Sequence, residues 1–387
     1  MNRIIFLIAL LAAFPPLSTD MYLPAIPILK ETWGQPLVTV NLTLIVFFVV
    51  YCFGMLFYGP VSDRFGRRPP LLIGIGIYIV GSLLCGLSQN VWMMVGFRIL
   101  QAAGAASASA LSVAMTKDLF RPDLRAKMLA YVSIILGLAP MIAPIVGSWV
   151  MTFLSWPYVF VLQAVMGAIA MYGVYRIEEP LKTKSDSGIL RSVTAYVRLF
   201  RNPGFTGLNA ANAIIGISFF AFLAASSDIY ITHFGLSETT FGYLFAFNAF
   251  SMMAGAYSFS RIAGRVPFLK LMTISFAGIF VSGLYMLIGT NNDPWDLAIP
   301  MWTLGYFLGL SRPPVINLIL EQVDRDTGAA SAMVGFSYML IGALGMWIIS
   351  LGWTDKIAVI GIMAAITGGA DLLFWLVAKN RLTETVG

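Results

Sequence analysis

Charged residues are scarce in this chain. Asp, Glu, Lys and Arg make up 11% of its 387 residues, whereas a soluble globular protein has about a quarter. Hydrophobic residues make up 59%, and the mean hydropathy is +0.84. So little charge cannot cover the surface of a soluble protein of this length. The composition therefore indicates an integral membrane protein whose outer surface is solvated by lipid.

Motifs of enzymes and cofactor proteins are also missing. The only cysteines, Cys52 and Cys85, lie inside apolar runs and predict buried free thiols rather than a disulfide framework. There is no Gly-x-x-x-x-Gly-Lys-[Ser/Thr] loop, no His-Glu-x-x-His or paired-cysteine spacing, and no nucleophile elbow. These absences argue against ATP-driven transport, a metal site, a cofactor and enzymatic activity. The formal net charge of +6 is spread over short loops, so it does not indicate nucleic-acid binding.

Apolar stretches of about 20 residues recur along the whole chain, as expected for membrane-spanning helices. The first, which begins at Ile4, resembles a signal peptide. No small-x-small cleavage site follows, and the apolar run continues through Leu23, so we expect a span instead. The sequence predicts an all-α integral membrane protein with twelve spans, near 4–28, 38–58, 70–88, 91–115, 127–150, 156–176, 204–226, 239–259, 268–289, 296–320, 329–351 and 357–378.

Lysine and arginine are distributed unevenly between alternate loops. With the N-terminus inside, 20 of them fall in cytoplasmic segments, and only Lys30 and Lys356 fall on the other side. Arg98 and Arg312 remain inside spans. Because positive charge accumulates on the cytoplasmic side of membrane proteins, we expect both termini to be cytoplasmic.

The longest polar stretch, residues 177–203, divides the chain into segments 1–176 and 204–387, each with six predicted spans. It predicts either a disordered linker or a basic amphipathic helix on the inner leaflet. The helical interpretation depends on an apolar face, made by Leu190, Val193, Val197 and Phe200.

An internal repeat supports the division into two halves. A shift of 197 residues aligns Arg64 with Arg261 and Arg68 with Arg265, although Asp63 then aligns with Ser260. Two bundles related by such a parallel repeat are a known transporter architecture.

Four stretches of the first half have recognisable spacing. They are Ser-Thr-Asp-Met-Tyr-Leu-Pro-Ala-Ile-Pro at 18–27, Gly-x-x-x-Asp-Arg-x-Gly-Arg-Arg at 59–68, Gly-Phe-Arg-Ile-Leu-Gln-Ala-Ala-Gly at 96–104, and Gly-Leu-Ala-Pro-Met-Ile-Ala-Pro-Ile-Val-Gly at 137–147. Together they resemble the twelve-span drug:H⁺ antiporter branch of the major facilitator superfamily, and most closely its Bcr/CflA-like subgroup. The motif at 137–147 is similar to the signature of exporters.

The resemblance implies a major-facilitator fold of two six-helix bundles, and it gives roles to motif residues. A cytoplasmic gate loop, which would latch that side, is expected from Gly59, Asp63, Arg64, Gly66, Arg67 and Arg68. The antiporter-type motif is expected from Gly137, Pro140, Pro144 and Gly147, where a hinge and simple tight packing both remain open.

Asp20 and Arg98 are ionisable residues predicted at similar depth in the outer half of the membrane. Asp20 lies ten residues from Lys30, about 15 Å at helical rise, and Arg98 lies eight residues from Asn90, about 12 Å. Such groups are costly in lipid unless they face the bundle interior, water or a partner. We expect Asp20 to be the protonation site and Arg98 its partner. The alternatives are that Asp20 binds backbone amides at the end of its helix and that Arg98 extends to the headgroups.

Polar and aromatic residues on single helical faces predict the lining of a substrate cavity. The candidates are Tyr22, Gln101, Asn209, Asn212, Phe220 and Arg312. Arg312 has three interpretations: it binds an acidic substrate group, pairs with Asp371, or extends to the headgroups. Asp228 is interpreted as a solvated charge at a helix end, or as part of the outer vestibule.

The sequence thus predicts a proton-coupled secondary transporter that exports lipophilic or amphiphilic small molecules across a bacterial inner membrane, as a monomer. The alternative is a dedicated exporter of one anionic metabolite, such as a siderophore or an organic acid. A receptor is disfavoured because the sequence has no soluble domain or large external loop. A membrane enzyme is disfavoured because no helix face carries a cluster of ionisable residues.

Overall fold

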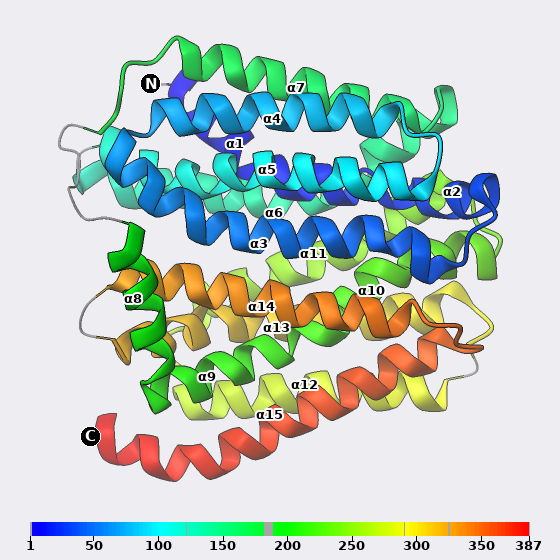
Figure 1. Cartoon of the computed structure of the whole chain (residues 1–387). Coiled ribbons are helices and arrows are strands. Elements are labelled where there is room, and N and C mark those ends of the chain that lie inside the picture. Colours follow the sequence, from blue (N-terminus) through cyan, green and yellow to red (C-terminus); the bar gives the residue numbers. More distant parts are fainter. Residues whose placement is uncertain (1, 121, 182–188, 290, 324–325, 387) are drawn as a thin grey trace. The chain divides into compact units, whose positions relative to one another are not determined.

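The computed structural model describes residues 2–120, 122–181, 189–289, 291–323 and 326–386. Throughout these ranges the regular secondary structure is helical. Two compact units are present, Met1–Val197 with Ser237–Tyr243, and Arg198–Leu236 with Leu244–Gly387. The boundaries between them fall within α8 (Ile189–Phe200), just before α11 (Glu238–Ile262), and within α11. Each unit is a bundle of long helices (Figure 1).

The first unit contains eight complete elements. They are α1 (Asn2–Asp20), the 3₁₀ turn η1 (Leu23–Ala25), α2 (Ile26–Trp33), α3 (Leu37–Phe65), α4 (Arg68–Gly86), α5 (Val91–Leu119), α6 (Pro122–Phe153) and α7 (Pro157–Tyr175). Figure 1 shows α3, α4, α5 and α7 running side by side. Glycines permit this close approach: a Cβ atom at Gly81 of α4 would lie 2.6 Å from the Gln101 amide nitrogen of α5.

The second unit contains α9 (Pro203–Ile214), α10 (Gly216–Ser227), the π-helical turn η2 (Asp228–His233), α12 (Phe268–Ile288), α13 (Pro294–Glu321), α14 (Thr327–Ile349) and α15 (Lys356–Val386). Its main packing pairs are α12 with α15, α10 with α14, and α12 with α13. A Cβ atom at Gly283 of α12 would lie 2.7 Å from the Gly361 carbonyl oxygen, so glycine also permits close contact here.

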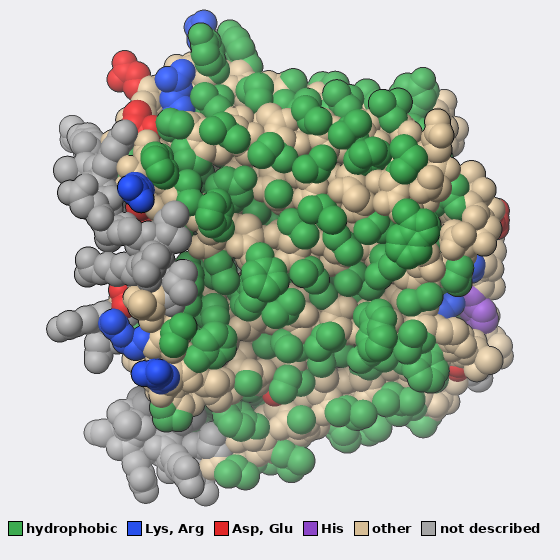
Figure 2. Space-filling model, viewed as in Figure 1, with side chains coloured by type: hydrophobic (Ala, Val, Ile, Leu, Met, Phe, Trp, Pro, Cys, Tyr) green, Lys and Arg blue, Asp and Glu red, His purple; other side chains and the backbone are tan. Residues whose placement is uncertain are grey.

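Ten helical segments of the described chain are long and apolar enough to cross a membrane. Two of the twelve predicted spans, α11 and α13, are long enough but fall outside this set, since serine, asparagine, tyrosine and tryptophan lower their hydropathy. Large apolar side chains are widely exposed, including Phe153 (81%) and Ile288 (82%). On the face shown in Figure 2, they cover the middle of the helices, and charged side chains gather mainly near the ends. This pattern fits a lipid-facing surface, and the chain is an all-helical membrane protein.

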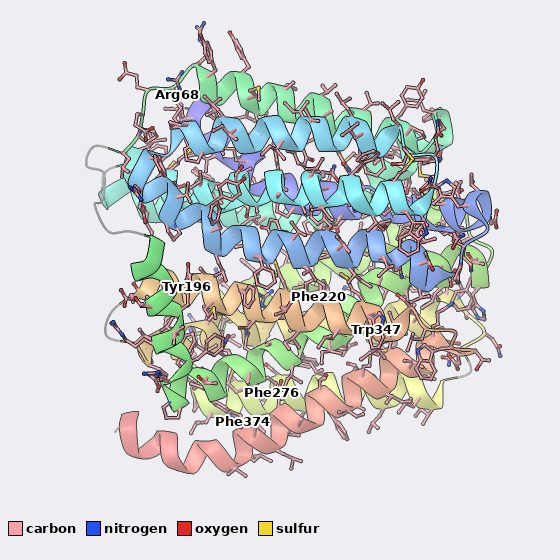
Figure 3. All side chains as sticks on the ribbon, viewed as in Figure 1. Arg68, Tyr196, Phe220, Phe276, Trp347 and Phe374 are labelled. Carbon is pink, nitrogen blue, oxygen red and sulfur yellow. The ribbon has the colours of Figure 1, made fainter. Side chains whose placement is uncertain are left out.

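The polar stretch 177–203 contains helix α8, as the amphipathic interpretation expects. Ala195 and Leu199 are buried, whereas Val197 and Phe200 are about half exposed. The side chains of Leu190 and Val193 lie outside the described residues. Tyr196 donates a hydrogen bond of 3.1 Å to the Leu56 carbonyl of α3 (Figure 3).

Candidate functional site

The first membrane span is interrupted near Asp20. α1 ends at this residue, the short η1 turn follows, and α2 continues the span. Pro24 and Pro27 explain the interruption, because neither has an N–H group to donate to the carbonyl four residues earlier. Irregular backbone inside a membrane protein is tolerated where other groups satisfy it.

Arg98 of α5 satisfies one backbone group at this interruption. The Tyr22 amide donates to the Thr19 carbonyl (3.2 Å), not to that of Ser18, the usual α-helical acceptor. The freed Ser18 carbonyl accepts a 2.9 Å hydrogen bond from Arg98 Nη1, which also donates to Gln101 Oε1 at 2.7 Å. The guanidinium therefore bonds a backbone carbonyl that the interrupted helix leaves without an amide donor.

Three aromatic rings surround the Arg98 guanidinium. Its central carbon lies 4.6 Å from the ring centre of Tyr22, 4.7 Å from that of Phe47 and 5.7 Å from that of Phe160. Arg98 is fully buried, and its Nε atom donates to the Thr43 carbonyl at 3.3 Å. Among the described residues its Nη2 atom has no hydrogen-bond partner, and Arg98 forms no ion pair. Aromatic faces and carbonyl dipoles thus stabilise this cation inside the bundle.

Gln101 links four helices of the first unit. Its amide nitrogen donates to Ser82 Oγ (2.8 Å) and Gln163 Oε1 (2.7 Å), and Gln163 donates to the Leu17 carbonyl (3.1 Å). Its oxygen accepts from Arg98. With no exposed surface, Gln101 is an internal connector in this conformation rather than an open cavity contact.

Tyr22, another predicted cavity residue, is likewise fully buried. Its hydroxyl lies 2.9 Å from Thr43 Oγ1, and its ring packs against Arg98. In this conformation Tyr22 therefore packs its ring against the Arg98 guanidinium and does not line an open cavity.

Asp20 lies at the same interruption and is 5% exposed. Thr19 Oγ1 donates to its Oδ1 atom at 2.8 Å. The expected ion pair between Asp20 and Arg98 is not formed within the described part of the chain, since the guanidinium donors are directed at the Ser18 carbonyl and Gln101. Asp20 is thus a buried carboxyl group with a neutral partner beside the arginine site.

The loop between α3 and α4 forms a charged cluster at one end of the first unit. Arg67 makes ion pairs with Asp63 (2.6 Å) and with Asp118 (2.8 Å), which lies at the end of α5. It also donates to Ser62 Oγ at 2.6 Å. Arg64 stacks on the neighbouring Phe65 ring at 5.5 Å. The ion pairs join α3, α4 and α5 at this end.

Glu179 completes this cluster at the start of α4. Its two carboxylate oxygens accept from the backbone amides of Arg67 (2.7 Å) and Arg68 (3.0 Å). The next two residues, Pro69 and Pro70, have no N–H group, so these amides are the donors available at this helix start. The Arg68 side chain donates to the Tyr175 carbonyl at 2.7 Å (Figure 3). The carboxylate therefore caps α4 and also complements its dipole.

Asp118, Gln163 and Glu179 are contributors that the sequence analysis missed. Each is distant in sequence from its partner. A signal was nonetheless present for the acids, because Asp118 and Glu179 follow spans that end on the same predicted side as Arg67. Gln163 offered no comparable signal.

The 137–147 motif lies in the second half of α6. Pro140 and Pro144 are inside the helix and leave carbonyls without helical donors. A Cβ atom at Gly147 would lie 2.9 Å from the Met21 Cα atom, so glycine permits contact with the broken first span. Gly137 is half-buried in the same helix. These contacts show close packing of α6 on the first span.

In the second unit, the predicted cavity residues lie on α9, α10 and α13, and two of them contact Tyr338 of α14. Asn209 donates to Ser337 Oγ at 2.9 Å. The ring centres of Phe220 and Tyr338 are 5.4 Å apart (Figure 3). The Arg312 guanidinium carbon lies 4.0 Å from the Tyr338 ring centre. Asn212, on the same helix as Asn209, is also buried.

Arg312 and Asp371 do not pair in the structure as described. Asp371, on α15, is 2% exposed, and its Oδ2 atom has no hydrogen-bond partner in the described chain. The two residues lie on different helices, α13 and α15, which both pack on α12. Arg312 instead stacks on Tyr338.

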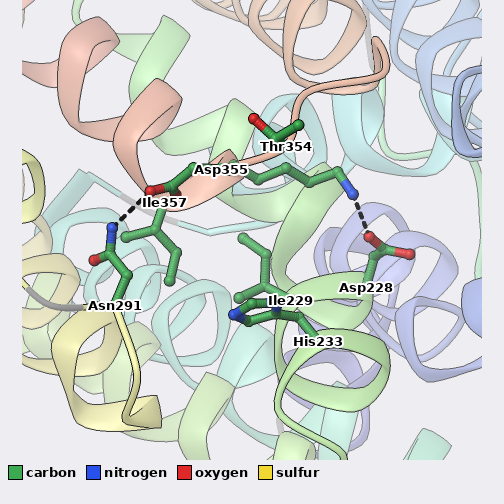
Figure 4. Close-up of a pocket in the computed structure, with 8 residues that line it drawn as sticks. Asp228, Ile229, His233, Asn291, Thr354, Asp355 and Ile357 are labelled. Atoms are coloured by element: carbon green, nitrogen blue, oxygen red, sulfur yellow. Dashed lines mark hydrogen bonds and ion pairs between the residues drawn. The ribbon is translucent and has the colours of Figure 1, made fainter.

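Asp228 is not the solvated charge that the sequence suggested. It is 3% exposed and makes an ion pair of 2.5 Å with Lys356 at the start of α15. The pair borders a pocket of about 240 Å³ that His233, Asn291 and other residues line (Figure 4). Asp228 is buried because the π-helical turn η2 holds it within the bundle.

Buried polar and ionisable residues within membrane-spanning helices often mark substrate or ion pathways, as in transporters and channels. The family comparison is more specific. The Major Facilitator Superfamily model matches residues 8–346, and the chain belongs to this family of transporters. It is not an enzyme.

Several bacterial relatives match almost the whole chain. An uncharacterized MFS-type transporter YdgK of Bacillus subtilis is 28% identical over 98% of this chain and 96% of its own. The bicyclomycin resistance protein homolog of Haemophilus influenzae is 27% identical over 98% and 96%. The multidrug resistance protein D of Escherichia coli is 26% identical over 99% and 97%. The chain is therefore a multi-pass membrane transporter related to drug-resistance antiporters.

The fold is similar to that of solved transporters. The crystal structure of a D-xylose–proton symporter has a TM-score of 0.74 with 14% identity, and the match covers 97% of both chains. At this identity the similarity shows the major-facilitator fold and nothing about substrate.

Proposed function

We propose that this protein is a proton-coupled exporter of lipophilic or amphiphilic small organic molecules. The names of its relatives, which include bicyclomycin and multidrug resistance proteins, support export of such compounds. We further propose that the α3–α4 loop lies on the cytoplasmic side of a bacterial inner membrane, with both termini, because most lysines and arginines fall on that side.

The proposal of proton coupling depends on the position of Asp20. It is a buried carboxyl group at an interruption of the first span, and a neutral hydroxyl is its hydrogen-bond partner. Losing a proton there creates a charge whose desolvation is costly unless water or a cation approaches. Arg98 donates to the Ser18 carbonyl, two residues before Asp20 in the sequence, so a cation is held at the same interruption of the span. Proton release at Asp20 would therefore favour a rearrangement of the span around Arg98.

In this proposal, substrate movement and proton release both involve the interrupted segment of the first span. α6 contacts this segment at Gly147, so a shift at the interruption is transmitted to the proline-containing part of α6. Such a linkage allows proton release and substrate movement to alternate.

The test is transport by Asp20→Asn in proteoliposomes with an imposed pH gradient. The amide is nearly isosteric but cannot release a proton, so proton-driven transport should fall to background while folding is retained. Glu31→Gln is the matched control, because Glu31 is exposed on the same span and the substitution removes the same charge. Proton-driven transport by Asp20→Asn at the wild-type rate would refute the assignment.

A further inference from the structure

The second unit contains a cation inside a membrane span that has no anion. Arg312 lies nine residues before the end of α13 at Glu321, about 13 Å at helical rise. Among the described residues it makes no ion pair, and its buried Nε atom has no hydrogen-bond partner. Asp228 pairs with Lys356, and Asp371, on α15, forms no ion pair with Arg312 in the described chain. The charge of Arg312 is therefore uncompensated within the described part of this unit.

Neutral polar groups without partners lie on α9 and α14, which pack against each other and against α13. In the part of the chain that the structure describes, the Tyr338 hydroxyl and the Asn212 amide nitrogen are buried without hydrogen-bond partners. Tyr338 stacks under the Arg312 guanidinium at 4.0 Å. Asn212 lies one helical turn from Asn209, which bonds Ser337, the residue before Tyr338. Unsatisfied buried donors are rare in folded proteins and need an explanation.

The position of Tyr338 is fixed by its neighbours. Its ring packs on Phe220, and a Cβ atom at Gly216 would lie 2.8 Å from it. Glycine at position 216 thus leaves space for the ring, over which the Arg312 guanidinium lies. Arg312 as a residue is partly exposed, although its Nε atom is buried, so part of the side chain is accessible to a ligand. The candidate site thus has one cation, Arg312, and two neutral donors, the Tyr338 hydroxyl and the Asn212 amide. The aromatic rings of Phe220 and Tyr338 lie beside them.

Given the proposed export function, on which this inference rests, we propose that Arg312, Tyr338 and Asn212 bind the carboxylate of an amphiphilic monocarboxylate substrate. A carboxylate matches the planar guanidinium and can accept further hydrogen bonds from the hydroxyl and the amide. Phe220 and Tyr338 suit an apolar or aromatic body beside it. A phosphate monoester carries about −1.5 to −2 charges, which one arginine and two neutral donors would leave partly uncompensated.

The experiment measures binding to the purified full-length protein in lipid nanodiscs by isothermal titration calorimetry. The probes are 1- and 2-naphthoate and longer aryl-alkanoates, each with its methyl ester and its primary amide. We expect the carboxylates to bind and their esters and amides to bind far more weakly. Arg312→Gln should weaken carboxylate binding by about 10–100-fold, the range expected when a charged hydrogen-bond partner is lost.

Further variants separate binding from folding. Arg312→Lys keeps the charge but loses the planar fork, so it should retain part of the affinity. Tyr338→Phe keeps the ring packing and should weaken binding by about 2–10-fold through its lost hydroxyl. Arg265→Gln is the matched control, because Arg265 is exposed on the same unit and its loss should leave binding unchanged.

Three results would overturn the inference: no carboxylate binding to the wild type, equal binding of esters, or unchanged carboxylate affinity in both Arg312→Gln and Tyr338→Phe. Proton-driven export of neutral or cationic compounds with no carboxylate binding would leave the proposed function intact and remove only this substrate class. Carboxylate binding that depends on Arg312, without proton-driven export in proteoliposomes, would refute the function and keep the site.

Discussion

The Arg98 guanidinium donates to the main-chain carbonyl of Ser18 at 2.9 Å and, within the described chain, makes no ion pair with Asp20, two residues further along. Cation and carboxyl thus lie at one interruption of the first span without neutralising each other in this conformation. Given the proposed proton coupling, we expect two arrangements: Arg98 bonded to the backbone, as here, and Arg98 directed to an ionised Asp20. A proton-coupled transporter requires an element with two arrangements that protonation can bias.

Arg98→Lys tests whether more than charge is required at this site. The ammonium group cannot reach the Ser18 and Thr43 carbonyls and Gln101 together in the arginine geometry, and it loses stacking on three rings. We expect proton-driven transport to fall at least about tenfold, with the protein still folded by size-exclusion chromatography. Arg261→Lys, at an exposed position, is the control. Wild-type transport by Arg98→Lys would show that positive charge alone suffices.

Gly66→Ala tests the backbone at the α3–α4 loop. Gly66 has φ +102°, and a Cβ atom there would lie 2.7 Å from Glu179 Oε2. A residue with a side chain is strained in this region by about 1–3 kcal/mol, so the variant should unfold at lower temperature than the wild type. Gly59→Ala is the matched control, since Gly59 is helical and a Cβ atom there would have open space for 4 Å around it. Alanine in that helix should be neutral or slightly stabilising.

Equal unfolding temperatures for Gly66→Ala and Gly59→Ala would contradict the close approach of Glu179. If both variants lost stability, glycine would be required at positions 59 and 66 for a reason other than the φ angle.

The positions of the spans could be predicted because a helix needs about 20 apolar residues to cross the membrane. This requirement does not depend on which other helices it packs against. The stretch expected at 91–115 is α5, and the one expected at 268–289 is α12. The apolar spacing does not reveal which carbonyl a buried arginine binds. The Ser18 carbonyl has no helical donor because the Tyr22 amide bonds Thr19 at the interruption, and Arg98 reaches this carbonyl across 80 residues of sequence. Neither the missing helical bond of this carbonyl nor its contact with Arg98 can be derived from the amino-acid composition or from the spacing of apolar residues.

The error at Asp228 has the same origin. A carboxylate near the end of a span is normally solvated, and only the packing of α15 brings Lys356, 128 residues away, to its side. Motif spacing located Asp63 and Arg67 correctly as a charged cluster, because they are only four residues apart, on either side of the end of α3. Long-range partners such as Glu179 require the fold itself.

Glu179 should stabilise α4 through both its hydrogen bonds and its charge. Glu179→Gln keeps an acceptor but removes the charge near the helix start, which is worth about 0.3–1 kcal/mol. Glu179→Ala also removes the bonds to the Arg67 and Arg68 amides and should cost about 1 kcal/mol more for each. Thermal unfolding of the purified protein should rank the wild type above Glu179→Gln and Glu179→Ala lowest. Glu178→Gln, a neighbour with the same charge change, should match the wild type. An alanine variant as stable as Glu178→Gln would contradict the capping role.

The Asp228–Lys356 pair allows a test by a double-mutant cycle. Lys356→Met leaves a buried carboxylate without its lysine, and Asp228→Asn leaves the lysine without its anion. Breaking a buried pair in this way costs about 3–5 kcal/mol, whereas replacing both charges is often neutral. Unfolding in denaturant should therefore show both single variants strongly destabilised and the double variant close to the wild type. Additive losses in the double variant would show that the two residues act independently.

Salt dependence distinguishes this pair from ion pairs at the surface. The side chains of Asp228 and Lys356 are 5% and 20% exposed, so mobile ions should screen their attraction weakly. Arg198 and Asp326, at 3.6 Å, are 71% and 43% exposed and provide the comparison. Because a surface pair contributes about 0–1 kcal/mol and is screened by salt, the small effect of Asp326→Asn should vanish between about 0.05 and 0.5 M NaCl. The effect of Lys356→Met should persist over the same range, and its disappearance there would place the pair in contact with solvent.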